Sequence, residues 1–346
     1  MKKFLSYGSI ARFEKFVKDF KHHCEYTGTV DSIPQYDESK DKPVIDFKGT
    51  VKLHGTNASV VYDHAENMLY PQSRRGVISI KKDNAGFASF VDHHYDALME
   101  LVSNIYPSSD HLVTVYGEWV GKGIHKGVAV NQLERKTFVV FGVKVSPKES
   151  EDSEFWLNFD DIENIKYHDI DVYNVLDFKT FDVRLDFNHP NEALKTVTDL
   201  ALSVEEQCPV GKYFDIEGVG EGIVFYGEYQ GNTLKFKVKG DKHKGSGKAK
   251  VPLTEEQLAA LSEKQKVATL LTPSWRLEQG LDEVFDRLNG GTLDITRMKD
   301  YIKWVIDDIV KEDMHILHEN DMILKDVSGY VSKAIVAYFK EEDSIL

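Results

Sequence analysis

The chain has 346 residues, 41% of them hydrophobic and 29% charged, which is the composition of a folded, water-soluble protein. A chain of this length is more typical of two domains than of a single core. Its net charge of −14 argues at first against a nucleic-acid partner, because phosphate binding is driven by basic surface.

The sequence contains no segment that would place the chain in a membrane or outside the cell. No apolar run approaches the roughly 20 residues that a transmembrane helix needs. The N-terminus lacks the long apolar segment and the small-residue cleavage site of a signal peptide. Two cysteines, Cys24 and Cys208, provide neither a disulfide framework nor the spacing of a metal site. We therefore expect a reducing, intracellular location, in the cytoplasm.

Up to about Lys239, short runs rich in β-branched and aromatic residues indicate strands, with stretches of helical spacing between them. The strands are expected at residues 44–51, 58–62, 112–119, 137–145, 222–226 and 233–239. The helices are expected at residues 86–105 and 191–206. Because helices interrupt the strands irregularly, the order favours an α+β fold with antiparallel sheets.

The pattern changes after Gly245-Ser246-Gly247, where no further strand is indicated. Thr254, followed by two glutamates, is typical of a helix start. Amphipathic patterns continue through residues 275–288, 295–310 and 322–339. We therefore predict a first domain over residues 1–243 and a small all-α domain over residues 250–346, joined by a linker rich in lysine and glycine.

The end of the first domain carries a dense run of lysines. Between residues 235 and 250 the only acid is Asp241, and the lysines are Lys235, Lys237, Lys239, Lys242, Lys244, Lys248 and Lys250. A solvated loop is the ordinary interpretation of such a run. The alternation of lysine with Phe236 and Val238, however, places three lysines on one face of a strand. This pattern favours a face that binds a polyanion.

The most informative peptide is Lys52-Leu53-His54-Gly55-Thr56-Asn57, which lies between two expected strands. A lysine at a strand end, with glycine three residues later, can present its amine in a pocket while the backbone turns tightly. Alone, Lys-x-x-Gly is a weak signal, and a surface turn with a solvated lysine is the ordinary alternative.

Further segments follow in a fixed order and strengthen this signal. They are Gln72-Ser73-Arg74-Arg75-Gly76, Tyr116-Gly117-Glu118-Trp119, Phe138-Val139-Val140-Phe141, Glu221-Gly222-Ile223-Val224 and Lys237-Val238-Lys239. In this order the chain resembles the covalent nucleotidyltransferases, the ligases and capping enzymes that pass through a lysine–nucleotide adduct. The resemblance implies a nucleotidyltransferase (ATP-grasp-like ligase) domain of antiparallel sheets with helices.

Within that superfamily, the chain is most similar to the phage-type RNA ligase 2 family. Histidine at position 54 and the extension Gly55-Thr56-Asn57 carry this likeness, as does the segment 116–124. A weaker likeness reaches the helical tail, at residues 272–276 and 306–309. The chain departs from the family at Val51 and Gly142, where acids are common, and this leaves the recognition of adenine open.

The resemblance implies an ATP-dependent RNA ligase that acts on nicked duplex or broken RNA in a cell such as a phage-infected host. Lys52 would attack ATP, AMP would pass to an RNA 5′-phosphate, and a 3′-hydroxyl would then expel AMP. The attacking lysine must be a free amine, which costs roughly 4 kcal/mol near neutral pH. Nearby cations such as Lys237 and Lys239 lower that cost. Mg²⁺ or Mn²⁺ would bind the phosphate oxygens.

The resemblance also implies the residues of the site. The nucleotide-binding residues are His54, Asn57, Arg74, Glu118, Phe141, Glu221, Lys237 and Lys239, and the catalytic residues are Lys52, Lys237 and Lys239. Phe141 would stack on adenine, Glu118 would accept a hydrogen bond from the ribose, and Glu221 would be the carboxylate nearest the metal. Arg276 and Asp308 would bind RNA or support sealing.

Each of these residues also has an ordinary alternative. Phe141 fits a core strand, Glu118 and Glu221 fit strand-end acids, and Arg276 and Asp308 fit the surface of amphipathic helices. A DNA ligase or an mRNA capping enzyme is the alternative enzyme, although both usually carry an OB-fold after the terminal Lys-x-Lys. A non-catalytic polyanion-binding protein is the alternative outside enzymes. We expect a monomer.

Overall fold

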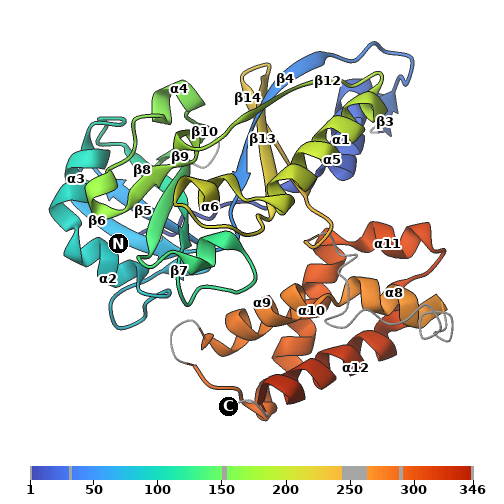
Figure 1. The fold of residues 1–346 in the computed structure, drawn as a ribbon. Coiled ribbons are helices and arrows are strands. Elements are labelled where there is room, and N and C mark those ends of the chain that lie inside the picture. The colour runs from blue at the N-terminus through green and yellow to red at the C-terminus, as the bar shows by residue number, and fades with distance from the viewer. Residues whose placement is uncertain (1, 31–32, 150–153, 244–262, 288–290, 344–346) are drawn as a thin grey trace. The chain divides into compact units, whose positions relative to one another are not determined.

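The computed structural model describes residues 2–30, 33–149, 154–243, 263–287 and 291–343 (Figure 1). Contacts between residues divide the chain into two units, Met1–Val238 and Lys239–Leu346. Strands and helices are mixed in the first unit, whereas the described elements that begin after Lys239 are all helices. The predicted α+β class is confirmed. Lys244, Lys248, Lys250 and the helix start expected at Thr254 lie outside the described residues.

A five-stranded sheet carries the lysine segments of the first unit. Its order is β1 (Ala11–Arg12), β14 (Asn232–Lys239), β13 (Gly222–Tyr229), β4 (Val44–Lys52) and β12 (Phe181–Asp186). Both neighbours of β4 run antiparallel to it, and the short β1 pairs parallel with β14. Strands β4, β13 and β14 lie where strands were expected, whereas β1 and β12 were not predicted.

Two helices, α1 (Phe13–Glu25) and α5 (Pro190–Glu206), cover one face of this sheet and share its core. From β4, Phe47 and Val51 point into that core. Because side chains alternate along a strand, Lys48 and Lys52 point to the opposite face. We call this opposite face the inner face of the five-stranded sheet.

A second, larger sheet lies in the same unit (Figure 1). Its order is β10 (Phe155–Trp156), β9 (Thr137–Pro147), β8 (His111–Val120), β5 (Thr56–Asp63), β6 (Met68–Ser73) and β7 (Gly76–Val77), and β11 (Val172–Asn174) pairs parallel with β9. The central pairs are antiparallel and long, as the β-branched runs predict.

One helix was expected over residues 86–105, and the structure has two there, α2 (Phe87–His93) and α3 (Tyr95–Ser103). The break lies at His94, whose backbone leaves helical geometry at φ −109° and ψ 25°. The break lets both segments bury apolar side chains: Phe87 packs on Trp119, and Leu98 and Val102 are buried from α3.

The N-terminal segment is tied to the larger sheet by side chains of its strands. The backbone NH of Leu5 donates to Gln72 Oε1 at 3.1 Å, and Gln72 Nε2 donates back to the Leu5 carbonyl at 2.5 Å. The Tyr116 hydroxyl also donates to this carbonyl, at 2.9 Å. These bonds hold Tyr7 against the rings of Tyr116 and Phe141, with centroid separations of 5.2 and 5.1 Å.

Smaller elements complete the first unit. They are β2 (Tyr26–Val30), β3 (Ile33–Tyr36), α4 (Phe159–Ile162), α6 (Pro209–Tyr213) and 3-10 helices at Ala129–Gln132, His168–Ile170 and Val175–Asp177. Strands β2 and β3 form an antiparallel hairpin of their own.

The described part of the second unit is helical, as the amphipathic patterns predict. Its elements are α8 (Glu263–Leu271), α9 (Ser274–Phe285), a 3-10 turn at Ile295–Arg297, α10 (Met298–Glu312), α11 (Met314–Glu319) and α12 (Leu324–Asp343). They share one hydrophobic core, in which Leu281, Tyr301 and Val331 are fully buried. Among the helices of the described residues, none combines the length and the apolar character that crossing a membrane requires.

Candidate active site

Lys52 ends β4 and faces the carboxylate of Glu221, which immediately precedes the neighbouring strand β13. Its Nζ lies 2.6 Å from Glu221 Oε2, and Glu221 is only 3% exposed. The strand register explains this pairing, because Lys52 is opposite Gly222 of β13 and Glu221 immediately precedes that residue. After Lys52 the chain turns so tightly against β8 that a Cβ at Gly55 would lie 2.4 Å from the Trp119 carbonyl oxygen. Glycine is therefore required there.

Glu118 of β8 lies beside the same turn. Its Oε1 accepts a hydrogen bond from the Gly55 backbone NH at 3.0 Å, and its partner in the register of β5 is Asn57. Burial raises the pKa of Glu118 to about 7, while the nearby Lys52 opposes this shift and the negative charge of Glu221 adds to it. Near neutral pH this carboxyl group therefore exchanges a proton with little cost.

The raised pKa of Glu118 predicts how stability changes with pH. The unfolded side chain ionises near pH 4.5 but the folded one only near pH 7, so the free energy of unfolding should fall as pH rises between these values. The loss should be about 3 kcal/mol, and Glu118→Gln should avoid it. Urea unfolding of both proteins across this range measures the difference. Exposed Glu66→Gln is the control, and parallel curves for Glu118→Gln and wild type would contradict the prediction.

Two histidines stack beside the lysine. His54 Nδ1 lies 3.5 Å from Glu221 Oε2, and its ring stacks on that of His125 with a centroid separation of 4.7 Å. Burial lowers the pKa of His54, although Glu221 opposes the shift, so His54 is neutral at pH 7. His125 was not predicted from the sequence. The feature of the sequence that could have indicated His125 is its position directly after the Gly-Glu strand and the glycine-rich loop that follows this strand.

The remaining nucleotide-binding candidates lie at different distances from this cluster. Lys237 is 8% exposed and alternates with Phe236, which lies in the core, so Lys237 points to the inner face that also carries Lys52. Lys239 is the last residue of the same strand. Arg74 instead lies exposed in the turn between β6 and β7, and within the described residues it forms no ion pair with the carboxylates near Lys52.

Phe141, in β9 of the larger sheet, belongs to an aromatic group with Tyr7 and Trp156. It is partly buried against the main core, contacts Tyr7 edge-on, and lines a cavity of about 760 Å³. Trp156 and Lys235 also line this cavity. The contributions of Tyr7 and Trp156 were not predicted from the sequence, because neither residue belongs to a motif.

In the second unit, Arg276 is completely buried, which contradicts the interpretation of this residue as a surface side chain. Its Nε donates to Asp308 Oδ2 at 2.7 Å, its Nη2 donates to Asp313 Oδ2 at 2.5 Å, and its Nη1 donates to the Leu271 carbonyl at 2.7 Å. The guanidinium group of Arg276 therefore donates these hydrogen bonds to groups inside the second unit. Asp308 remains partly accessible, with 21% of its side chain exposed.

Comparison with known proteins identifies solved structures that are similar to this chain. Among solved structures, the chain is similar to the RNA ligase of Naegleria gruberi, in a mutant with AMP and Mn, a mutant with ATP and Mn, and the protein with PPi. Each has 14% sequence identity and a TM-score of 0.44, and the match covers 70% of this chain but only 58% of that chain. No curated protein matches this sequence.

A family model described as RNA ligase matches residues 45–239. The match covers more than half of the 346 residues and includes Lys52, Glu118 and Glu221. The chain therefore belongs to the RNA ligase family.

Proposed function

We propose that this protein is an ATP-dependent RNA ligase that joins 3′-hydroxyl and 5′-phosphate ends of RNA through a covalent AMP on Lys52. The observation that carries this proposal is the contact of Lys52 Nζ with buried Glu221 at 2.6 Å, inside the residues that the family model matches. His54 and the following Gly55-Thr56-Asn57 support the phage-type RNA ligase 2 branch of the family.

The proposed first step forms a bond between Lys52 Nζ and the α-phosphorus of ATP and expels pyrophosphate. In the resting ion pair Lys52 is held as an ammonium, so a proton must leave before the attack. Mg²⁺ or Mn²⁺ held by Glu221 and phosphate oxygens would supply positive charge that stabilises the transition state and disfavours the ammonium form. AMP then moves to an RNA 5′-phosphate, and the attack of a 3′-hydroxyl releases it.

Other residues of the two sheets have positions that suit parts of ATP. Glu118 and its strand neighbour Asn57 lie beside the Lys52 turn, where a ribose hydroxyl would find a hydrogen-bonding carboxyl group. Neutral His54 adds a polar ring without adding charge. Phe141 offers a ring face to the base, and Lys237 and Lys239 offer positive charge to the phosphates.

Incubation with radiolabelled ATP and magnesium tests the proposed function. We expect label on the denatured chain, on the peptide that contains Lys52, and its release as AMP when a nicked RNA duplex is joined. Parallel reactions with GTP and with nicked DNA test the two alternative enzymes, a capping enzyme and a DNA ligase. A chain that takes up no label from ATP would contradict the proposal.

The lysines of β14 and of the following segment should have separate functions. Lys237 and Lys239 lie on the strand face that ATP would occupy, whereas Lys244 and Lys248 lie outside the described residues. Alanine at Lys237 or Lys239 should abolish adenylylation of the chain. Alanine at Lys244 or Lys248 should weaken only RNA binding, with a smaller loss of affinity between about 50 and 200 mM salt than in wild type. Equal loss of adenylylation in both pairs would contradict this division.

We assign adenylylation to residues 1–243 and RNA engagement to residues 250–346. Every residue proposed to contact ATP precedes Lys242, and the described helices of the tail build a core of their own. In the tail, Asp308 is the member of the Arg276 cluster that reaches the surface. Arg276 would therefore support sealing indirectly, by shaping the helices that meet RNA.

A further inference from the structure

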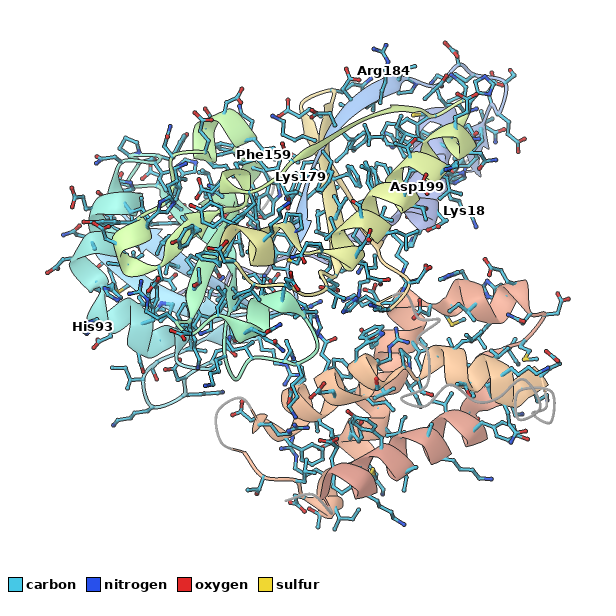
Figure 2. All side chains as sticks on the ribbon, viewed as in Figure 1. Lys18, His93, Phe159, Lys179, Arg184 and Asp199 are labelled. Carbon is cyan, nitrogen blue, oxygen red and sulfur yellow. The ribbon has the colours of Figure 1, made fainter. Side chains whose placement is uncertain are left out.

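The cavity beside Phe141 lies on the same face as Lys52 and between the two sheets of the first unit. Its walls include Phe141 and Trp156 from the larger sheet and Tyr226 and Lys235 from the five-stranded sheet. Phe159 and Arg184, which also line it, are labelled in Figure 2.

The strand register gives the separation between this cavity and the reactive lysine. On β4, Lys52 pairs with Gly222 and Lys48 pairs with Tyr226. The two pairs are four residue steps apart along the strand, which is about 13 Å at 3.3 Å per residue. A nucleotide with its α-phosphorus at Lys52 and its base directed toward Phe141 would bring that base to the cavity.

Lys235 is an unusual group in the cavity wall. Its Nζ lies 3.1 Å from the centroid of the Trp156 ring, 5.3 Å from that of Tyr226 and 5.4 Å from that of Tyr7. Within the described residues it forms no ion pair. Burial, with a smaller effect of Lys144, lowers its pKa to about 7.

Aromatic faces hold a cation but do not accept its hydrogen bonds as oxygen or nitrogen atoms do. A buried amine without such an acceptor is costly unless a ligand supplies one. The carboxylates that line the cavity are exposed and form no ion pair with Lys235; they are Asp46, Asp160, Asp182 and Glu228. The amine of Lys235 is therefore ready to donate to a group that enters the cavity.

The indole of Trp156 forms the wall of the cavity beside Gly142, the residue after Phe141. A Cβ at Gly142 would lie 3.2 Å from Trp156 Cζ3, so the indole covers the position where a side chain would otherwise project. The amine of Lys235 lies over this indole. A donor at this position suits an acceptor on the ligand, and the ring nitrogens of a purine are such acceptors.

With the base placed against Phe141 as in the proposed function, we propose that Lys235 is a further nucleotide-binding residue, which donates a hydrogen bond to a ring nitrogen of the purine in this cavity. Trp156 and Tyr226 position the amine, and Phe141 offers the adjoining ring face. This inference rests on the proposed function for the identity of the ligand as an adenosine nucleotide and for the place of its base.

Binding of adenosine, which carries no phosphate, tests the inference without any chemical step. By calorimetry, Lys235→Met should bind adenosine about tenfold more weakly than wild type, because methionine keeps the length of the side chain but lacks the donor. Lys179→Met is the matched control: this lysine also lies over an aromatic ring, that of Phe181 at 5.2 Å, but it is exposed and outside the cavity (Figure 2). Its affinity for adenosine should equal that of wild type.

Adenosine analogues that lack N1, N3 or N7 complete the test. One of them should bind wild type about tenfold more weakly than adenosine but should show no further loss with Lys235→Met. Equal affinity of wild type for all three analogues and adenosine would overturn the inference, even if Lys235→Met failed to fold. Unchanged adenosine binding by a folded Lys235→Met would also overturn it. Because binding is measured without ATP, failure of self-adenylylation would leave this result intact and would contradict only the proposed function.

Discussion

Replacing Lys52 by arginine should abolish transfer of AMP from ATP to the chain, a loss of roughly 10³-fold or more, as for other covalent nucleophiles. Arginine can keep the ion pair with buried Glu221 but stays protonated at any accessible pH, so it cannot attack phosphorus. Label on the denatured chain after incubation with radiolabelled ATP measures the effect. This substitution separates the role of Lys52 as nucleophile from its role as a partner of Glu221.

Two further variants make the result specific. Lys52→Ala should be equally inactive and also less stable, because it leaves the Glu221 carboxylate buried without its cation. Lys18→Ala, on the exposed side of α1 (Figure 2), should label like wild type. Full labelling of either Lys52 variant would mean that another residue carries the AMP.

The second large effect is expected in the helical unit. Arg276→Met should lower the free energy of unfolding by about 3 to 5 kcal/mol, because it removes the partner of two carboxylates, one of them completely buried. The exposed pair of Arg297 and Asp300, at 3.5 Å, provides the control, and Arg297→Ala should cost no more than about 1 kcal/mol. Chemical denaturation of the full-length chain measures both.

The same variant should separate the two activities. The residues proposed to contact ATP are in the segment up to Lys239, so Arg276→Met should still become adenylylated. It should join a nicked RNA duplex poorly, because the helices that present Asp308 would be loosened. Normal sealing by a destabilised Arg276→Met would show that the shape of the tail is not needed. Wild-type stability of Arg276→Met would show that the buried ion pairs of Arg276 contribute little to the free energy of unfolding.

The sequence by itself determined the order of the motifs and part of the secondary structure. Runs rich in β-branched and aromatic residues predicted β4 and β13, alternation with period two supported β14, and amphipathic spacing predicted the helices of the tail. These patterns all depend on residues close together in the chain. The motif order also anticipated a cluster around Lys52. The register of β4 with β13 then places Glu221 beside it. Local patterns cannot show where a helix breaks, and the single helix expected over residues 86–105 was wrong for that reason.

Only the tertiary structure decided what surrounds these side chains. Tyr7, Trp156 and Lys235 come from distant parts of the chain and meet because two sheets face one cavity, which no local pattern encodes. His125 stacks on His54 for the same reason. Arg276 shows most clearly that a local sequence pattern does not determine whether a side chain is buried. In an amphipathic pattern an arginine counts as a surface residue, but here two aspartates offset the cost of burying its charge, so it lies in the interior.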